Sequence, residues 1–565
     1  MKVVLDIEAD GLNPTKIWCI VAKDIKTNEV YTFEPDTLSD FQNFSKNISV
    51  YIGHNLIGYD LPALHKLLNI TVPLDRVVDT LVISRLLDSQ RGKHSLEYWG
   101  LQLGHEKVEH NDWDVYSPEM LHRCTEDVHL NHKIYEALLQ EAKTKQTPKS
   151  VFRSEHYIAQ MVEEMRMGGI LLDEQKAQLL LATLRQRKRE LDDELLTTFI
   201  SLPVFKREVH PKLTKAGEYS RVGLKGFDSA DIGGSFSSIT WPDPNLNSQQ
   251  FIIKHLVNAG WRPTVFTDKG NPRLTEWVLE SAAEKFPKAK LVMEWDLVDR
   301  RITMVESWID ASDNDCRIHG SVNTIGAKTH RMSHWGPNIA QVPASDKPYG
   351  KNCRELFTVP DGYKMVGTDA SGIQLRVLAH YTGDKDYIAE VVDGDIHTAN
   401  QKAGGFKTFI YAWLLGAGAP KIGEIMGGTA KEGANARKLF LENTPALKRA
   451  KYKYERLAER GYIIGLDKRW IPIAEPYFTL SVLLQSGEVI LMKKAAELWS
   501  EKASHLDWRM VAWVHDEWQT EVREDHAEEL GKIQVQSIRD AGPLLGCLCP
   551  LDGEYKIGYN WSETH

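Results

Sequence analysis

The stretch RMVAWVHDEWQTEV, residues 509–522, constrains the fold more than any other feature of this 565-residue sequence. The run VAWV is typical of a buried strand, and WQTEV alternates apolar and polar residues in the manner of a second strand. Three polar side chains separate the two runs: His515, Asp516 and Glu517. Because charges at the mouth of a buried hairpin are costly unless they are paired, we expect a bound cation or solvent there.

Length and composition describe an ordinary globular chain. At roughly 150 residues per domain, 565 residues predict about four domains. The hydrophobic fraction is 42%, the charged fraction is 26%, and no apolar run approaches the ~18 residues of a membrane span. An acid as early as Asp6 interrupts any signal-peptide core, so we expect an intracellular protein with no membrane segment. The six cysteines lack zinc or redox spacing and are expected to be reduced structural thiols.

The formal net charge of −9 argues weakly against nucleic acid as a partner. Phosphate contacts, however, need only a locally basic surface. The segment 206–226 offers one, because it carries six basic residues against two acidic ones. A solvated loop and a loop that faces DNA both explain this segment, and both readings stay open.

The order of strand-like and helix-like patterns predicts an α/β protein of several domains. Strand-like alternation followed by helical patterns fills residues 1–145, and the Pro-, Lys- and Thr-rich segment 143–150 predicts a linker. Helices dominate residues 146–310, apart from a basic segment at 203–247 whose Gly, Ser and Pro predict irregular loops. Strands and helices mix again over residues 311–565.

Carboxylates spaced along the first domain predict a metal site. Asp6 and Glu8 stand two apart in a predicted strand and therefore point to one face. Asp60 precedes a predicted helix, and Asp127 lies in another. Two Mg²⁺ ions need several oxygen ligands, and such a pair of ions activates water in phosphodiester cleavage. A lone Asp-x-Glu is usually surface sequence, so the ordered set carries the prediction.

This ordered set resembles the DEDD family of 3′→5′ exonucleases, which have a ribonuclease H-like fold. The resemblance implies that Asn55 contacts DNA beside the third motif, and it implies four metal ligands, Asp6, Glu8, Asp60 and Asp127. Polymerase-linked members have a tyrosine base four residues before the last aspartate, where this chain has Arg123. His122 has the spacing of the histidine branch and can accept a proton near neutral pH. We expect His122 to be the base; an exposed histidine near a helix start is the alternative.

A second pair of acids predicts another metal site. The stretch YKMVGTDASGIQLRVLAHY, residues 363–381, predicts a strand that ends at Asp369, then a turn and a helix. If Asp369 lies beside Asp516, the two carboxylates can bind two Mg²⁺ ions. Such ions activate a hydroxyl group and hold a triphosphate, and the protein supplies positioning and charge neutralisation.

Here nearly the whole chain resembles family A DNA polymerases, the DNA polymerase I family, and above all the replicative polymerases of podovirus-type bacteriophages. GTDASGIQLR resembles motif A, which implies Asp369 and the Ala370 carbonyl as metal ligands. WVHDE resembles motif C, which implies Asp516 as a metal ligand, with His515 and Glu517 near the primer end. The implied cofactor is Mg²⁺, two ions per active site, with Mn²⁺ as a substitute.

The same resemblance implies contacts to substrate. KTFIYAWLLGAG resembles the fingers helix, where Lys407 and Tyr411 share one face at i, i+4. Arg331 and Gln485 correspond to residues that read the primer minor groove. The implied nucleotide contacts are Lys407, Tyr411, Gln374, His397 and Lys402.

Several residues depart from the family pattern. Ala403 stands where the family has an arginine for the triphosphate, and Lys402 can substitute as a less directional contact. Leu415 replaces a tyrosine that stacks near the templating base, and Gln374 replaces the glutamate that blocks the ribose 2′-hydroxyl. The 203–247 segment is short beside the thioredoxin-binding insertion of known relatives, which argues against a thioredoxin clamp.

We therefore expect a DNA-dependent DNA polymerase with 3′→5′ proofreading that serves phage DNA replication as a monomer in the infected bacterium's cytoplasm. The expected domains are an exonuclease at 1–145, a thumb at 146–310, a palm at 311–395 and 460–565, and fingers at 396–459. Expected partners are primer–template DNA, deoxynucleoside triphosphates, a helicase–primase and a single-strand-binding protein. The alternatives are an exonuclease whose polymerase half extends primers poorly, and a DNA-binding scaffold without catalysis.

Overall fold

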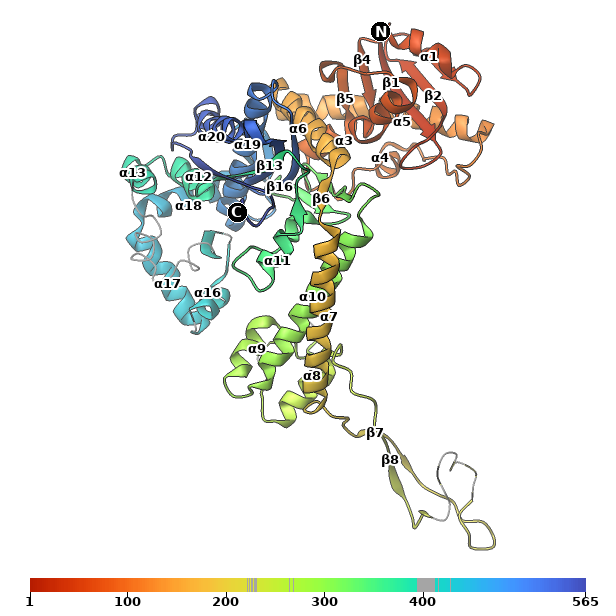
Figure 1. Cartoon of the computed structure of the whole chain (residues 1–565), viewed down its shortest axis with the longest axis vertical. Coiled ribbons are helices and arrows are strands. Elements are labelled where there is room, and N and C mark those ends of the chain that lie inside the picture. Colours follow the sequence, from red (N-terminus) through yellow and green to blue (C-terminus); the bar gives the residue numbers. More distant parts are fainter. Residues whose placement is uncertain are drawn as a thin grey trace. The chain divides into compact units, whose positions relative to one another are not determined.

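The structure is a computed structural model of the chain. It describes residues 1–220, 222, 224, 227, 231–263, 265–267, 269–393, 412–414, 416–426 and 428–565. Four expected nucleotide contacts, His397, Lys402, Lys407 and Tyr411, lie outside the described residues. Ala403 and Leu415 lie outside them as well. The chain forms two compact units, one of Met1–Asp173 with Ala311–His565 and one of Glu174–Asp310 (Figure 1).

A five-stranded sheet forms the core of the N-terminal region (Figure 1). Its strands, in spatial order, are β3 (Val30–Phe33), β2 (Ile17–Asp24), β1 (Lys2–Ala9), β4 (Val50–Gly53) and β5 (Val77–Asp79). The central strand β1 pairs antiparallel with β2 and parallel with β4. Alternate residues of β1 enter different cores: Leu5 packs with Phe41 and Leu64, and Val4 packs with Met120. Helix α5 therefore covers the face of the sheet to which the even-numbered residues of β1 point.

The helices of this region begin and end with ordinary capping signals. They are α1 (Leu38–Ser45), the short η1 (Leu56–Asp60), α2 (Leu61–Leu68), α3 (Thr80–Leu87), α4 (Leu96–Leu103), α5 (Pro118–Lys145) and α6 (Lys149–Gly168). In α5, Ser117 caps the first turn by accepting from the Met120 N–H at 3.2 Å, and Pro118 occupies the first helical position. The expected linker at 143–150 is shorter than predicted, because only residues 146–148 separate α5 from α6.

A four-stranded antiparallel sheet carries the second pair of acids. Its strands, in spatial order, are β16 (Trp508–Val514), β17 (Glu517–Arg523), β13 (Tyr363–Ala370) and β18 (Gly553–Gly558). The predicted hairpin is confirmed, because Val514 pairs with Glu517 across a two-residue turn. His515 starts that turn at φ 56°, in the left-handed region. The sheet packs on α12 (Ile373–Thr382), α19 (Thr479–Lys502) and α20 (Ala527–Leu544) through one large apolar core.

Shorter elements complete the first unit. The strands are β6 (Ile170–Leu172), β9 (Arg317–Ile318), β10 (Ser321–Asn323), β11 (Ser333–Trp335), β12 (Phe357–Thr358), β14 (Tyr462–Ile464) and β15 (Trp470–Pro472). The helices are α11 (Gly350–Arg354), α13 (Lys385–Asp393), α16 (Ala419–Ile425), α17 (Ala430–Asn443) and α18 (Pro445–Ala458). In the part of the chain that the structure describes, no helix is long and apolar enough to cross a membrane.

The second unit is built on two long helices that pack together. Its helices are α7 (Glu174–Leu196), α8 (Gln249–Asn258), α9 (Glu276–Ala283) and α10 (Lys288–Asp310). Ion pairs join α7 to α10, including Arg187 Nε to Glu294 Oε1 at 2.8 Å. The 203–247 segment is not wholly irregular, because β7 (Val204–Val209) and β8 (Phe236–Thr240) pair as an antiparallel ribbon. Most side chains of this ribbon are exposed, which explains why it lacks the apolar alternation of a buried strand.

Candidate functional sites

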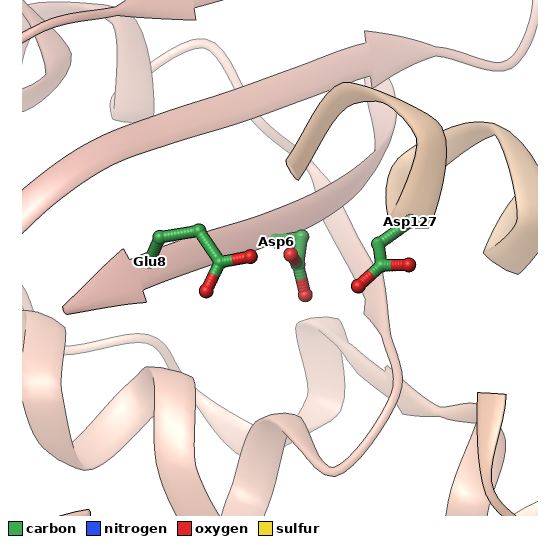
Figure 2. A group of neighbouring side chains, drawn as sticks. All are labelled: Asp6, Glu8 and Asp127. Carbon is green, nitrogen blue, oxygen red and sulfur yellow. The ribbon is translucent and has the colours of Figure 1, made fainter. Parts of the chain in front are cut away.

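Three of the four predicted N-terminal carboxylates meet in space. The ligand oxygens of Asp6, Glu8 and Asp127 lie within 4.8 Å of one another. Asp6 and Glu8 leave the same face of β1, and Asp127 extends toward them from α5 (Figure 2). The strand periodicity supplies the first two side chains, and the packing of α5 on the sheet supplies the third.

Asp60 stands outside this group of three but belongs to the same surroundings. Asp60 is the last residue of η1 and is 4% exposed. The pKa of Asp6 is raised first by burial, then by the charge of Glu8, and then by the charge of Asp60. Asp79 holds this segment in place, because its carboxylate accepts from the Asn55 N–H at 3.0 Å and the Ile57 N–H at 3.1 Å. Asn55 itself is exposed, in a left-handed conformation at φ 68°.

The electrostatics of this cluster favour a bound cation. Burial raises the pKa of Glu8 to about 7, although the charge of Arg123 opposes the shift. Burial also raises the pKa of Asp127, with Lys107 opposing. Neighbouring desolvated carboxylates disfavour one another's ionised forms, and a divalent cation would reverse that effect. Oxygen-only donors of this kind suit Mg²⁺.

Two basic side chains that sequence reasoning did not place contact the cluster. Lys107 Nζ lies 3.0 Å from Asp127 Oδ2, and Arg123 Nε lies 3.2 Å from Glu8 Oε1. Arg123 stands four residues before Asp127 on α5, so helix periodicity could have predicted this placement. Lys107 lies between α4 and α5 and gives no comparable local signal.

His122, the expected general base, is not at the carboxylates. It is exposed on α5, whereas its neighbour Arg123 reaches Glu8 and Asp127. Successive helix residues are rotated by about 100°, and five residues carry His122 to the side of α5 away from Asp127. The role of His122 as a base therefore stays a prediction without support from the geometry.

A cleft of about 1170 Å³ opens beside this cluster. Its walls include Asn55, Lys107 and Arg123 from the N-terminal region. Trp335, which is 63% exposed on β11, contributes an aromatic wall from a distant part of the chain. Arg85 and Lys93 add positive charge to the same cleft, whose walls also carry three glutamates, Glu97, Glu106 and Glu109.

The second pair of acids meets on the four-stranded sheet. Asp369 lies at the end of β13, directly opposite Glu517 of β17. The Ala370 N–H donates to the Asp516 carbonyl oxygen at 3.1 Å, which ties the hairpin turn to β13. Asp369 at the end of β13 and Asp516 in the turn between β16 and β17 are therefore neighbours in space.

This second site also concentrates negative charge. Burial, followed by the charges of Glu488 and Asp369, raises the pKa of Asp516 to about 8. Burial and the charge of Glu517 raise the pKa of Asp369 to about 6. Paired, partly desolvated aspartates fit the oxygen ligand set of a divalent cation.

Glu517 is anchored away from solvent. Its carboxylate accepts from the Trp561 indole N–H at 2.7 Å and pairs with His565 Nδ1 at 2.9 Å. Although burial opposes the shift, these contacts with His565 lower the pKa of Glu517. His515 is exposed at the turn.

Three residues expected near the substrate come together on α19 and its neighbours. Arg331 Nη2 lies 2.7 Å from Glu488 Oε1, and Gln374 Nε2 donates to Glu488 Oε2 at 2.7 Å. Gln485 lies one helical turn before Glu488 and donates to Ser481 Oγ at 3.2 Å. Sequence reasoning missed Glu488, although a single acid inside the apolar stretch LSVLLQSGEVILM was a usable signal.

Comparison with known proteins agrees with the sequence motifs. The sequence model of "DNA polymerase family A" matches residues 235–563. The DNA-directed DNA polymerases of Enterobacteria phage T3 and Escherichia phage T7 are each 30% identical to this chain, with 100% of both chains covered. The thermostable DNA polymerase I of Thermus aquaticus is 26% identical over 56% of this chain and 42% of its own length.

A solved structure shares the fold. It is the "POL domain of Pol1 from M. smegmatis complex with DNA primer-template and dNTP". The TM-score is 0.81 at 17% sequence identity, and the match covers 100% of this chain and 95% of that one.

Proposed function

The chain belongs to DNA polymerase family A, and from that premise we propose that it is a DNA-directed DNA polymerase. The observation that carries the proposal is the placement of Asp369, at the end of β13, beside Asp516 in the adjacent β16–β17 turn, with raised pKa values for both. Full-length similarity to the T3 and T7 DNA-directed DNA polymerases supports it. The proposed substrates are primer–template DNA and deoxynucleoside triphosphates.

In the proposed reaction, the primer 3′-hydroxyl attacks the α-phosphate and pyrophosphate leaves. Asp369, Asp516 and the Ala370 carbonyl would hold two Mg²⁺ ions, which supply hydroxyl activation and charge neutralisation when bound. Arg331 and Gln485 would contact the primer strand, and His515 and Glu517 would lie near its end. The proposed triphosphate contacts are Gln374, His397, Lys402, Lys407 and Tyr411.

We further propose that residues 1–145 act as a 3′→5′ exonuclease. The buried carboxylates Asp6, Glu8 and Asp127 support this, together with Asp60 nearby. Their oxygens would hold two Mg²⁺ ions, which supply an activated water when bound. Lys107 and Arg123 keep the carboxylates in place through their ion pairs. The basic side chains and the exposed Trp335 of the adjacent cleft suit the phosphates and bases of an unpaired DNA strand.

The biological setting is proposed from the T3 and T7 relatives. We propose that the protein replicates phage DNA in the cytoplasm of an infected bacterium, beside a helicase–primase and a single-strand-binding protein. Residues 146–310 are proposed as a thumb, most of which is the compact unit Glu174–Asp310, and the exposed β7–β8 ribbon would tether DNA through Lys206 and Arg207.

A gel assay on an end-labelled primer–template with Mg²⁺ tests both activities. We expect lengthening with all four deoxynucleotides and shortening without them. An absence of lengthening, repeated in an Asp6→Ala/Glu8→Ala variant, would overturn the polymerase proposal. That result would favour the second candidate, a 3′→5′ exonuclease with an impaired polymerase half, which the departures at Ala403 and Leu415 motivate.

A further inference from the structure

The carboxylate of Glu488 joins two side chains that lie far away in the sequence. Arg331, 157 residues earlier, approaches it with Nη2 at 2.7 Å, and Gln374, 114 residues earlier, donates with Nε2 at 2.7 Å. Glu488 is 1% exposed, so solvent contributes little to its charge stabilisation. Gln374 lies in the first turn of α12, five residues after Asp369 of the proposed catalytic pair, so its hydrogen bond places Glu488 beside that pair.

Helices α12 and α19 approach each other closely enough for Gln374 to reach Glu488. Gly487 precedes Glu488 on α19, and a Cβ atom built on it would lie 2.6 Å from Val377 Cγ1 of α12. Only a glycine therefore lets α12 come this near to α19. Gln374 stands one turn before Val377 on α12, where its amide reaches Glu488.

The contact fixes which end of the Gln374 amide is free. A carboxylate only accepts hydrogen bonds, so the amide must present its N–H₂ group to Glu488. The Gln374 carbonyl oxygen then remains available as an acceptor in the proposed polymerase site. A glutamate at position 374 would instead place a second, half-buried carboxylate against Glu488, which is unfavourable. The amide at 374 and the acid at 488 thus form a matched pair.

Glu488 also fixes the guanidinium of Arg331. The ion pair uses Nη2, whereas the buried Nε has no hydrogen-bond partner among the described residues. The Arg331 side chain as a whole keeps 21% of its surface exposed, so it can still contact a bound ligand. A charged guanidinium held in one place loses less entropy when it binds an acceptor on that ligand.

We propose that Glu488 is a positioning residue of the polymerase site. It holds the Gln374 carbonyl as an acceptor toward the nucleotide and the Arg331 guanidinium as a donor toward the primer strand. The inference rests on the proposed polymerase function and deepens it.

A charge-swap experiment tests the pairing. The variants are Glu488→Gln, Gln374→Glu and the double variant, with Glu501→Gln as a control on an exposed part of α19. Each is assayed for primer extension, for kcat, for KM of deoxynucleotide and of primer–template, and for melting temperature. We expect Gln374→Glu to raise the nucleotide KM by about tenfold or more through carboxylate repulsion. We expect Glu488→Gln to raise the primer–template KM by about threefold to tenfold through loss of the Arg331 ion pair.

The double variant distinguishes a matched Gln374–Glu488 pair from two independent effects. It restores one acid and one amide at the pair, so we expect its nucleotide KM to return to within about threefold of the wild-type value. A double variant whose KM increase equals the product of the single increases would overturn the inference. Unchanged KM values with lowered melting temperatures would overturn it too, because they would leave Glu488 a purely structural role. If the wild-type protein fails to extend primers, the proposed function fails instead, and that outcome is visible in the same gel.

Discussion

The Nζ of Lys493 lies 2.7 Å from Oε2 of Glu155 in the interior of the first unit, where neither side chain is more than 1% exposed. Arg469 Nη1 lies 2.7 Å from the other oxygen of the same carboxylate. The contact joins α6 to α19 across 338 residues of sequence. One buried carboxylate thus contacts two buried cations, and Asp467 Oδ2, 2.6 Å from Arg469 Nη2, is a second counter-ion for the arginine.

Glu155→Gln should destabilise the first unit strongly. Removing the charge leaves Lys493 buried without a counter-ion, whereas Arg469 keeps Asp467, and breaking a buried pair in this way costs about 3–5 kcal/mol. Urea unfolding followed by circular dichroism measures the loss. Lys502→Met is the control, because its ion pair with Asp540 at 2.7 Å is partly exposed and should contribute under about 1 kcal/mol. Equal losses in the two variants would contradict the role given to Glu155.

The Glu155 carboxylate should make the free energy of unfolding depend on pH in the acid range. Burial alone would raise the pKa of Glu155, but Lys493 and Arg469 lower it from 4.5 to about 2. A lowered pKa contributes stability above about pH 4.5 that is lost as pH falls toward 2. The difference in unfolding free energy between wild type and Glu155→Gln should therefore shrink between pH 4.5 and 2. A difference that stays constant across this window would exclude an ionised Glu155 as the cause.

The two proposed activities should be separable. Asp516→Ala should reduce primer extension by about a thousandfold or more, because a ligand of the proposed metals is lost, and it should spare degradation. Asp6→Ala with Glu8→Ala should do the reverse. Both variants are assayed on the same end-labelled primer–template, with and without nucleotides. Extension by Asp516→Ala at the wild-type rate would show that the hairpin acid is not a ligand.

Local sequence patterns predicted those parts of both sites that lie within a single strand or a single hairpin. Asp6 and Glu8 share a face because strand side chains alternate, and the 509–522 hairpin follows from two apolar runs around a polar turn. The meeting of Asp369 with Asp516 came from resemblance, because no local rule pairs strands so far apart in sequence. Glu488 was missed for the same reason, since its partners lie 157 and 114 residues away.

Local sequence rules did not predict features that depend on the packing of the whole chain. The 203–247 segment has turn-forming composition, yet part of it pairs as β7 and β8 with mostly exposed side chains. His122 has the spacing of a catalytic base, but the rotation of α5 needed to bury Met120 and Cys124 turns it outward. Spacing alone does not report that rotation.

Arg123→Ala should shift the pH dependence of the proposed exonuclease to higher pH. Arg123 opposes the rise in the pKa of Glu8, so its removal should raise that pKa further above about 7. Metal binding needs the ionised carboxylate, so the rate at pH 7 should fall by about tenfold and recover as pH rises. The measurement is the rate of shortening of a single-stranded, end-labelled oligonucleotide between pH 6 and 9. Arg76→Ala, an exposed arginine of the same domain, is the control.

His122→Ala in the same assay separates a base from a surface residue. A general base contributes about a hundredfold or more to the rate. From its exposed position on α5 we expect a change of less than about twofold, because no carboxylate of the cluster depends on it. A hundredfold loss would instead mean that α5 or the side chain moves when DNA binds, and it would restore His122 as the base. An unchanged pH profile in Arg123→Ala, in turn, would mean that Arg123 does not tune Glu8 in the working enzyme.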